Sequence, residues 1–359
     1  MSETTSRYSN IYLNDDSYKK EDKAVISVLY PYLLENLEQD QSLLKFLDSH
    51  KHAKNWMIFS DYCLDQKTLK KNLSVTFSIL PYNSPAEYQF YEKWLGTLHS
   101  KDIKKSKINE KFIRFTKTFP QLPIFNFSVI LEKGFNFYKD KDVSLEKYFD
   151  LRLDSLSRSF LRNTQYGLAE LPYQESINNV KRAIQALKQK GKVSEFKKVE
   201  LITTITTSLI KMIGDSTPDK KNIAWCSDRD VVMNILKGKT SSPIIFDMIY
   251  HDIHAIATNT HNQLSFIFNQ DKNNDNLVRV ADFIAGTLSD FDLELQGGVS
   301  HEKFLWVLYY CLTNKEKNSI LKLTFDDEIG PQLDRVEINT KPSSKFRWEK
   351  YLEQYGCTK

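Results

Sequence analysis

The chain of 359 residues has little cysteine and no long apolar run. Its four cysteines, Cys63, Cys226, Cys311 and Cys357, are far apart and form no CxxC pair, which argues against a zinc knuckle or a dense disulfide framework. No apolar stretch approaches the roughly 20 residues that span a bilayer. The N-terminal MSETTSRYSN lacks the apolar core of a signal peptide. We therefore expect a cytoplasmic protein that does not enter a membrane.

Familiar phosphate-binding and nucleophile motifs are also missing. The sequence contains no Walker loop, no dinucleotide fingerprint and no nucleophile elbow. Its 50 Lys and Arg residues exceed its 46 Asp and Glu residues by only four, a balance that fits many kinds of partner. The apolar share of 41% and the charged share of 27% are those of an ordinary globular protein. Only local patterns can therefore point to a function.

Apolar periodicity predicts the order of the elements. Residues 1–20 are polar and read as a disordered tail, and residues 21–50 as a helical segment kinked at Pro31. A buried strand at Trp56–Phe59 and an alternating strand at Leu73–Ile79 predict an antiparallel hairpin whose second strand has one covered face. Later strands are expected at 124–131, 223–226 and 264–268. Helices are expected at 87–98, 145–161, 177–190, 199–213, 244–257, 278–288, 304–312 and 346–355.

This order is typical of an α/β protein with helices on both faces of a mixed sheet. We expect a five-stranded sheet formed by residues 51–298, preceded by the N-terminal helical segment. Residues 299–359 follow the Gly297-Gly298 punctuation and are expected to pack back onto the sheet as a helical appendage.

Three aspartates stand at the ends of buried elements, where open α/β sheets carry their sites. Asp61 follows the apolar run Trp56–Phe59, and Asp228 follows the run at 223–226 in the same manner. Asp282 lies in RVADFIAG, a helix of mostly apolar and small residues. On that helix the nearby Gly286 leaves room for another backbone or an ion to come close.

A carboxylate taken from water needs a cation or hydrogen-bond donors beside it. One interpretation is structural: each aspartate pairs with a nearby cation such as Arg229 or Arg279, or caps an element. The other is that Asp61, Asp228 and Asp282 share one site.

The arrangement of these aspartates resembles that of RNase H-like enzymes, with one on the first strand, one after the fourth and one on the last helix. More narrowly, the chain is similar to an uncharacterised bacterial family predicted to have that fold. In that family the first strand ends in Asp-Glu-Ser and the last helix reads roughly QLADLIAG. The matching segments here are 58–61, 225–228 and 279–286, within about residues 55–290. Tyr62-Cys63 stands where the family has Glu-Ser, and Arg279 where Gln is usual.

The resemblance implies an RNase H-like sheet and a metal-dependent nuclease or another phosphodiesterase that processes nucleic acid. Asp61, Asp228 and Asp282 would be the catalytic residues and the ligands of Mg²⁺ or Mn²⁺, with Asp61 bridging two ions. Such ions, roughly 3.5–4 Å apart, activate a water and stabilise the leaving oxygen. The missing second carboxylate leaves open a non-catalytic module that binds a protein or nucleic-acid partner, and a homodimer is also left open.

Two weaker metal patterns compete with this interpretation. Asp271–Asp275 alternates oxygen ligands as a calcium loop does, but Asn276 replaces the turn glycine and position twelve lacks a Glu. We favour a solvated turn. His251, Asp252 and His254 cluster with His261 beyond them, but no third zinc ligand has a convincing spacing. A helix surface or part of the same cleft is favoured there.

Nucleic-acid contacts have two further candidates. Basic clusters occur at Lys104–Lys107 and Lys188–Lys198. We favour the interpretation that they are charged faces exposed to solvent, and contact with nucleic-acid phosphates is the more specific alternative. Tyr88, Tyr91 and Trp94 would stack on bases if they were exposed.

Overall fold

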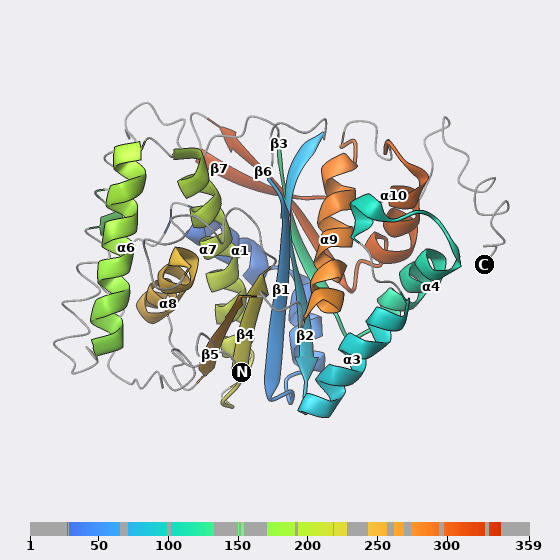
Figure 1. The fold of residues 1–359 in the computed structure, drawn as a ribbon, viewed down its shortest axis with the longest axis horizontal. Helices are drawn as coiled ribbons and strands as arrows, with labels where there is room; N and C mark the ends of the chain where they lie inside the picture. The colour runs from blue at the N-terminus through green and yellow to red at the C-terminus, as the bar shows by residue number, and fades with distance from the viewer. Residues whose placement is uncertain are drawn as a thin grey trace.

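The computed structural model describes residues 27, 29–64, 71–98, 102–132, 150, 152–153, 171–190, 193–217, 219–227, 243–256, 262–268, 274–293, 298–326 and 330–338. These residues form three layers, with a central sheet between two layers of helices (Figure 1). Within the described ranges, no helix combines the length and the apolar composition needed to cross a membrane.

The sheet has seven strands in the order β5-β4-β1-β2-β3-β6-β7. Their bounds are β1 Asn55–Cys63, β2 Asn72–Tyr82, β3 Phe125–Glu132, β4 Asn222–Ser227, β5 Gln263–Phe268, β6 Asn318–Asp326 and β7 Gly330–Arg335. The first three strands are antiparallel neighbours, and β4 and β5 run parallel to β1. β6 pairs parallel with β3, and β7 pairs antiparallel with β6. The predicted α/β class, mixed sheet and hairpin are confirmed.

The expected sheet of five strands is wrong in its extent, because the segment after residue 298 adds two strands. That segment begins with helices α10 (Glu302–Val307) and η4 (Leu308–Leu312), as expected, and both pack beneath helix α9 (Asp275–Asp290). It then returns to the sheet as β6 and β7, so it is not a purely helical appendage. Pro331 is tolerated in β7 because this strand lies at the edge of the sheet. The helix expected at 346–355 lies outside the described residues.

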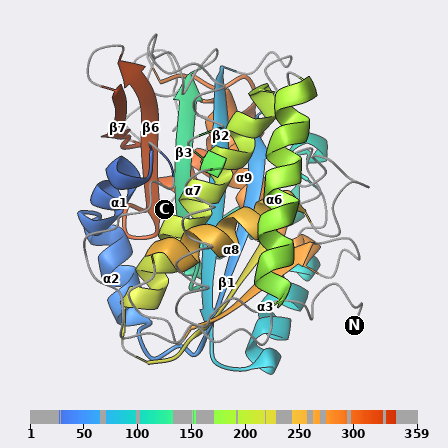
Figure 2. The same ribbon diagram turned by 90° about the vertical axis from the view of Figure 1, so that its left-hand side faces the viewer.

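Different helices cover the two faces of the sheet (Figures 1 and 2). One face carries α1 (Tyr30–Glu38), α2 (Gln41–Ser49), α6 (Leu171–Lys190), α7 (Val193–Asp215) and α8 (Ile244–Ile256). The other carries α3 (Pro85–Leu98), η2 (Ile103–Lys105), α4 (Glu110–Thr118), η3 (Phe119–Gln121), α9, α10 and η4. The helices expected near 87–98, 177–190, 199–213, 244–257 and 278–288 are thereby confirmed. The described part of the helix expected at 145–161 is confined to residues 150, 152 and 153.

The N-terminal helical segment is two helices rather than one kinked helix. Asp40 ends the connection between α1 and α2, and its Oδ1 accepts hydrogen bonds from the backbone N–H groups of Ser42 and Leu43. The same carboxylate lies 3.0 Å from the guanidinium of Arg335 in β7. A capping carboxylate therefore starts the second helix and ties it to the sheet edge. The tail predicted at residues 1–20 lies outside the described residues.

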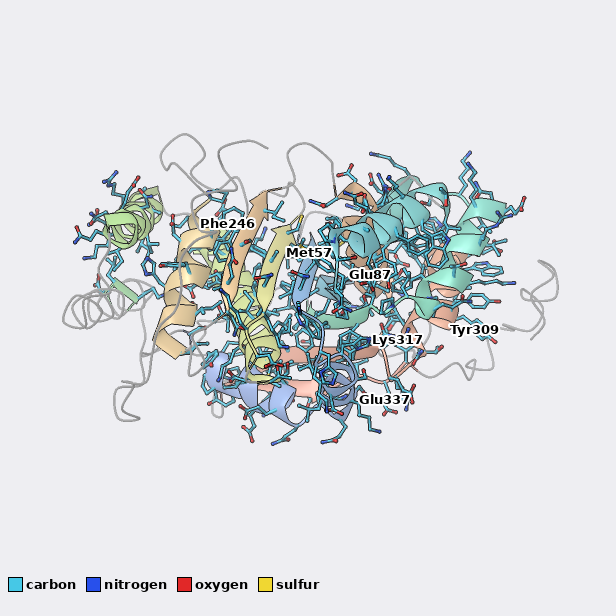
Figure 3. The ribbon with its side chains drawn as sticks, turned by 90° about the horizontal axis from the view of Figure 1, so that it is seen from below. Met57, Glu87, Phe246, Tyr309, Lys317 and Glu337 are labelled. Carbon is cyan, nitrogen blue, oxygen red and sulfur yellow. The ribbon has the colours of Figure 1, made fainter. Side chains whose placement is uncertain are left out.

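The alternating strand β2 has both faces covered, not one. Its apolar side chains belong to the core beneath α7 and α8, and its polar ones (Ser74, Thr76 and Ser78) are completely buried beneath the other layer. Because these side chains are small, α9 can pack closely across β1 and β2 on that face. Ser74 donates a 2.6 Å hydrogen bond to the carbonyl of Ala285. Seen from below, side chains fill the layers on both sides of the sheet, with Phe246 on one side of Met57 and Tyr309 on the other (Figure 3).

Candidate functional site

Asp61 lies inside a strand rather than after its end. The sequence predicted a strand that stops at Phe59, but β1 continues through Cys63 because Asp61 pairs with Thr76 and Cys63 with Ser74 of β2. Asp61 shares its strand face with Met57 and Phe59, and these two belong to the core beneath α9. The aspartate is only 9% exposed. Its carboxylate is therefore held in the layer between the sheet and α9.

The strand that precedes Asp228 is the direct neighbour of β1. The two strands are parallel, and their pairing runs from Asn55↔Asn222 to Ser60↔Ser227. Asp61 and Asp228 are the residues that follow this last pair in the two chain segments. Asp228 itself lies outside the described residues. The strand of Asp61 and the strand that precedes Asp228 are therefore adjacent in one sheet, and the place of the Asp228 side chain stays a prediction.

Asp282 lies on α9, half-buried, and another backbone approaches it. Its Oδ2 accepts a 2.7 Å hydrogen bond from the backbone N–H of Ile103 in η2. One turn further along α9, a Cβ on Gly286 would lie 2.6 Å from Cγ2 of Ile103. The absence of a side chain at Gly286 therefore lets η2 come close enough for the Ile103 N–H to donate to the Asp282 carboxylate. This is the backbone approach for which the small residues of RVADFIAG left room.

Two lysines, Lys105 and Lys303, interact with this carboxylate at longer range. The hydrogen bond to Asp102 raises the pKa of Lys105, and the negative charge of Asp282 adds to that shift. Burial lowers the pKa of Lys303, while the charges of Asp282 and Asp290 act in the opposite direction. Arg279, which the sequence offered as a partner for an aspartate, lies 3.8 Å from Asp275 and 4.0 Å from Asp102. Asp282 thus interacts electrostatically with Lys105 and Lys303, whereas Arg279 pairs with other aspartates.

A hydrogen-bonded network on the opposite face of the same strand ends was missed by the sequence analysis. The hydroxyl of Tyr62 lies 2.6 Å from Oγ of Ser60 and accepts a 3.0 Å hydrogen bond from Ser227. The indole N–H of Trp225 donates a 3.0 Å hydrogen bond to Oγ of Ser60. No signal in the sequence identifies this network, because it depends on the register between β1 and β4.

The donor chemistry of the predicted centre suits a hard divalent ion. Asp61 and Asp282 are carboxylates in the same layer of the fold, and carboxylate oxygens are ligands that Mg²⁺ and Mn²⁺ accept. Among the described residues, no group of three or more His, Cys, Asp and Glu side chains is placed to hold a metal ion. The predicted set includes Asp228, which those residues do not contain. The three-aspartate centre therefore stays a prediction.

Two members of the predicted histidine cluster, His251 and Asp252 of α8, lie neither on a helix surface nor in the same cleft as the aspartates. The side chain of His254 and the residue His261 lie outside the described part of the chain. His251 is 1% exposed and Asp252 is 2% exposed. Asp252 accepts a 2.7 Å hydrogen bond from Arg152, whose Nε donates at 3.1 Å to Glu200 of α7. This buried ion cluster lies on the face of the sheet opposite to α9 (Figure 1). His251 and Asp252 are therefore separated from Asp61 and Asp282 by the sheet.

The calcium-loop residues that the structure describes have structural partners. Asn274 accepts a hydrogen bond from the hydroxyl of Tyr88, and Asp275 lies in the first turn of α9 beside Arg279. Residues 269–273 are outside the described ranges.

The aromatic and basic candidates differ in exposure. Tyr88 packs against Phe59 and Tyr82, so it belongs to the core rather than to a base-stacking surface. Trp94 is half-buried and stacks against Phe90, which is 58% exposed. Among the candidate basic residues, Lys104, Lys105 and Lys107 are solvent-exposed, and the first two lie in η2, the turn whose first N–H donates to Asp282.

Comparison with known proteins adds no assignment to this geometry. The sequence matches no protein-family model, no curated protein and no solved structure.

Proposed function

We propose that the chain is a divalent-metal-dependent phosphodiesterase that cleaves nucleic acid on an RNase H-like sheet. The order β3-β2-β1-β4-β5, with a hairpin and third strand followed by parallel strands, supports the RNase H-like part of this proposal. β6 and β7 are additions at the far edge, next to β3, and they leave the β1–β4 junction unchanged.

One observation carries the proposal: the parallel pairing of β1 and β4 ends at Ser60↔Ser227, directly before Asp61 and Asp228. In open α/β sheets, ligands bind beyond the carboxyl ends of neighbouring parallel strands. Two carboxylates introduced at that point on adjacent strands are costly unless a cation compensates them. A bound divalent ion would supply that compensation.

Asp61, Asp228 and Asp282 would hold the metal, and each would have a defined role. Asp61 would bridge two ions, and Asp228 and Asp282 would each complete the coordination of one. When bound, the ions activate a water and stabilise the leaving oxygen of a phosphodiester. The lysines at 104, 105 and 107 would contact backbone phosphates, which depends on charge rather than on base sequence.

The contact between Ile103 and Asp282 favours a second candidate function, a non-catalytic module that binds a protein or nucleic-acid partner. A carboxylate that already accepts a backbone N–H at 2.7 Å has a structural role as a cap. In a degenerate RNase H-like protein, Asp282 would be retained for that cap alone, and the sheet would serve as a binding scaffold.

A nuclease screen separates the two functions. Single- and double-stranded DNA and RNA are incubated with Mg²⁺ or Mn²⁺ and with the wild type, Asp61→Asn or Asp282→Asn. Asp48→Asn is a matched control, because Asp48 forms an exposed ion pair with Lys51 far from α9. We expect the wild type and the control to cleave and the two site variants to be inactive. Binding without metal-dependent cleavage by the wild type would establish the binding module instead.

A further inference from the structure

The hydroxyl of Tyr62 connects β1, which carries Asp61, with β4, which ends directly before Asp228 in the sequence. Tyr62 belongs to β1, and Ser227, which donates to its hydroxyl at 3.0 Å, is the last residue of β4. Ser60, 2.6 Å from the same hydroxyl, is the register partner of Ser227. One phenol oxygen therefore contacts both members of the last pair in the β1–β4 ladder.

This connection is buried and stands at the point where the backbone pairing stops. Ser60 and Ser227 are completely buried, and Tyr62 is 6% exposed. Trp225 completes the network through its indole N–H on Ser60. Because these buried polar groups hydrogen-bond one another, the network favours a single arrangement of the strand ends. Apolar side chains at these positions would fill the same space, but they would not select one arrangement of the strand ends.

We propose that Tyr62 is a positioning residue for the candidate metal centre: its hydroxyl fixes the ends of β1 and β4 relative to each other, and thereby the position of the strand segment that carries Asp61. This inference rests on the proposed function. Tyr62 lies on the opposite strand face from Asp61, so it contacts neither the metal nor the substrate and acts only through the strand ends. It stands at one of the two positions where the resembled family has Glu-Ser.

The variant Tyr62→Phe removes one oxygen and leaves the ring against Phe77, 6.3 Å between centroids. Loss of a residue that orients a metal ligand without contacting the metal typically lowers the metal affinity by about 10–100-fold. We therefore expect the metal concentration at half-maximal stabilisation to rise at least about tenfold. Amide hydrogen exchange should also become faster in the peptide that contains Asp61.

The experiment titrates the wild type, Tyr62→Phe and Tyr82→Phe with Mg²⁺ and with Mn²⁺ and follows the melting temperature. Tyr82 is a matched control, since it lies on the same hairpin at the opposite end, paired with Asn55. The inference predicts equal metal midpoints for the wild type and Tyr82→Phe and a higher midpoint for Tyr62→Phe. A purely structural role would lower the melting temperature of Tyr62→Phe without metal and leave the midpoint unchanged, and that result would overturn the proposal.

Two further measurements keep the inference testable. If Tyr62→Phe does not fold, Ser227→Ala removes one arm of the network and should move the midpoint in the same direction; an unchanged midpoint rejects the inference. If the wild type itself gives no metal response, the proposed function fails, and hydrogen exchange alone decides whether Tyr62 fixes the strand ends. Faster exchange at residues 60–64 in Tyr62→Phe supports that role, and unchanged exchange rejects it.

Discussion

The backbone N–H of Ile103 donates a 2.7 Å hydrogen bond to Oδ2 of Asp282, across 179 positions of sequence. This contact gives a half-buried carboxylate a donor, which offsets part of the cost of removing it from water. It also places η2 against α9, the helix whose RVADFIAG segment carries the candidate aspartate. The cap and the metal interpretation of Asp282 therefore predict different outcomes for the same substitutions.

Without metal, Asp282→Ala and Asp282→Asn should differ in stability. Alanine removes the acceptor and leaves the Ile103 N–H unpaired, which costs about 0.5–2 kcal/mol at comparable caps. Asparagine keeps a side-chain oxygen, so its cost should be clearly smaller. Urea unfolding in the presence of a chelator measures both values. Equal free energies of unfolding for the two variants would show that the hydrogen bond contributes little.

Gly286→Ala should destabilise the protein through the same turn. The new Cβ would lie 2.6 Å from Cγ2 of Ile103, which is too close without movement of η2. Overpacking of this kind typically costs about 1–3 kcal/mol. Ile103→Ala opens the space, so the double variant should be less destabilised than the sum of the two single variants. Strict additivity in thermal or urea unfolding would contradict the close contact.

The buried cluster on the far side of the sheet predicts a large stability effect. Arg152 is 3% exposed and bridges Glu200 and Asp252, which are equally buried. Arg152→Met keeps much of the side-chain volume but leaves two carboxylates without the guanidinium. Loss of one partner from a buried ion pair costs about 3–5 kcal/mol. Lys51→Met, which removes an exposed ion pair with Asp48, is the control and should change little.

The same cluster predicts a pH dependence with a definite sign. Burial raises the pKa of Asp252 above its usual 3.8, and the nearby Arg152 offsets only part of that rise. The folded state therefore retains the proton to higher pH than the unfolded state does. Relative to Asp252→Asn, the wild type should lose stability as pH rises from about 3.8 towards the raised pKa, and then level off. Unfolding free energies of both proteins across this range test the sign; a relative gain for the wild type would contradict it.

Local patterns predicted most of the elements, and long-range pairing explains the errors. The run Ile223–Cys226 identified β4 because it is apolar throughout, as a strand covered on both faces must be. β6 and β7 were missed since Lys322 and Pro331 interrupt their apolar patterns. Pro331 is tolerated because β7 is the edge strand, and Lys322 of β6 forms an ion pair with Glu132 of β3. Asp61 was identified as a carboxylate at the end of a buried strand, but its inclusion in β1 depends on pairing with Thr76.

The candidate site shows the same limit. The small residues around Asp282 predicted that another group comes close, yet nothing local identifies Ile103 as that group. The role of Tyr62 was equally hidden, because its partner Ser227 reaches it only through the register of β1 and β4. Residue types indicate what a site could bind, whereas the hydrogen-bond partners within the site depend on how distant segments pair in the fold.

The most direct test of the central claim is a metal-dependent thermal shift of the wild type, Asp61→Asn and Asp282→Asn. If the aspartates hold Mg²⁺ or Mn²⁺, either ion at a hundredfold excess over its dissociation constant should stabilise the wild type by about 2.7 kcal/mol. The two variants should lose that stabilisation while remaining folded, and Asp48→Asn should keep it. Equal stabilisation of the wild type, Asp61→Asn and Asp282→Asn by the ion would contradict the account, and so would its absence from all of them.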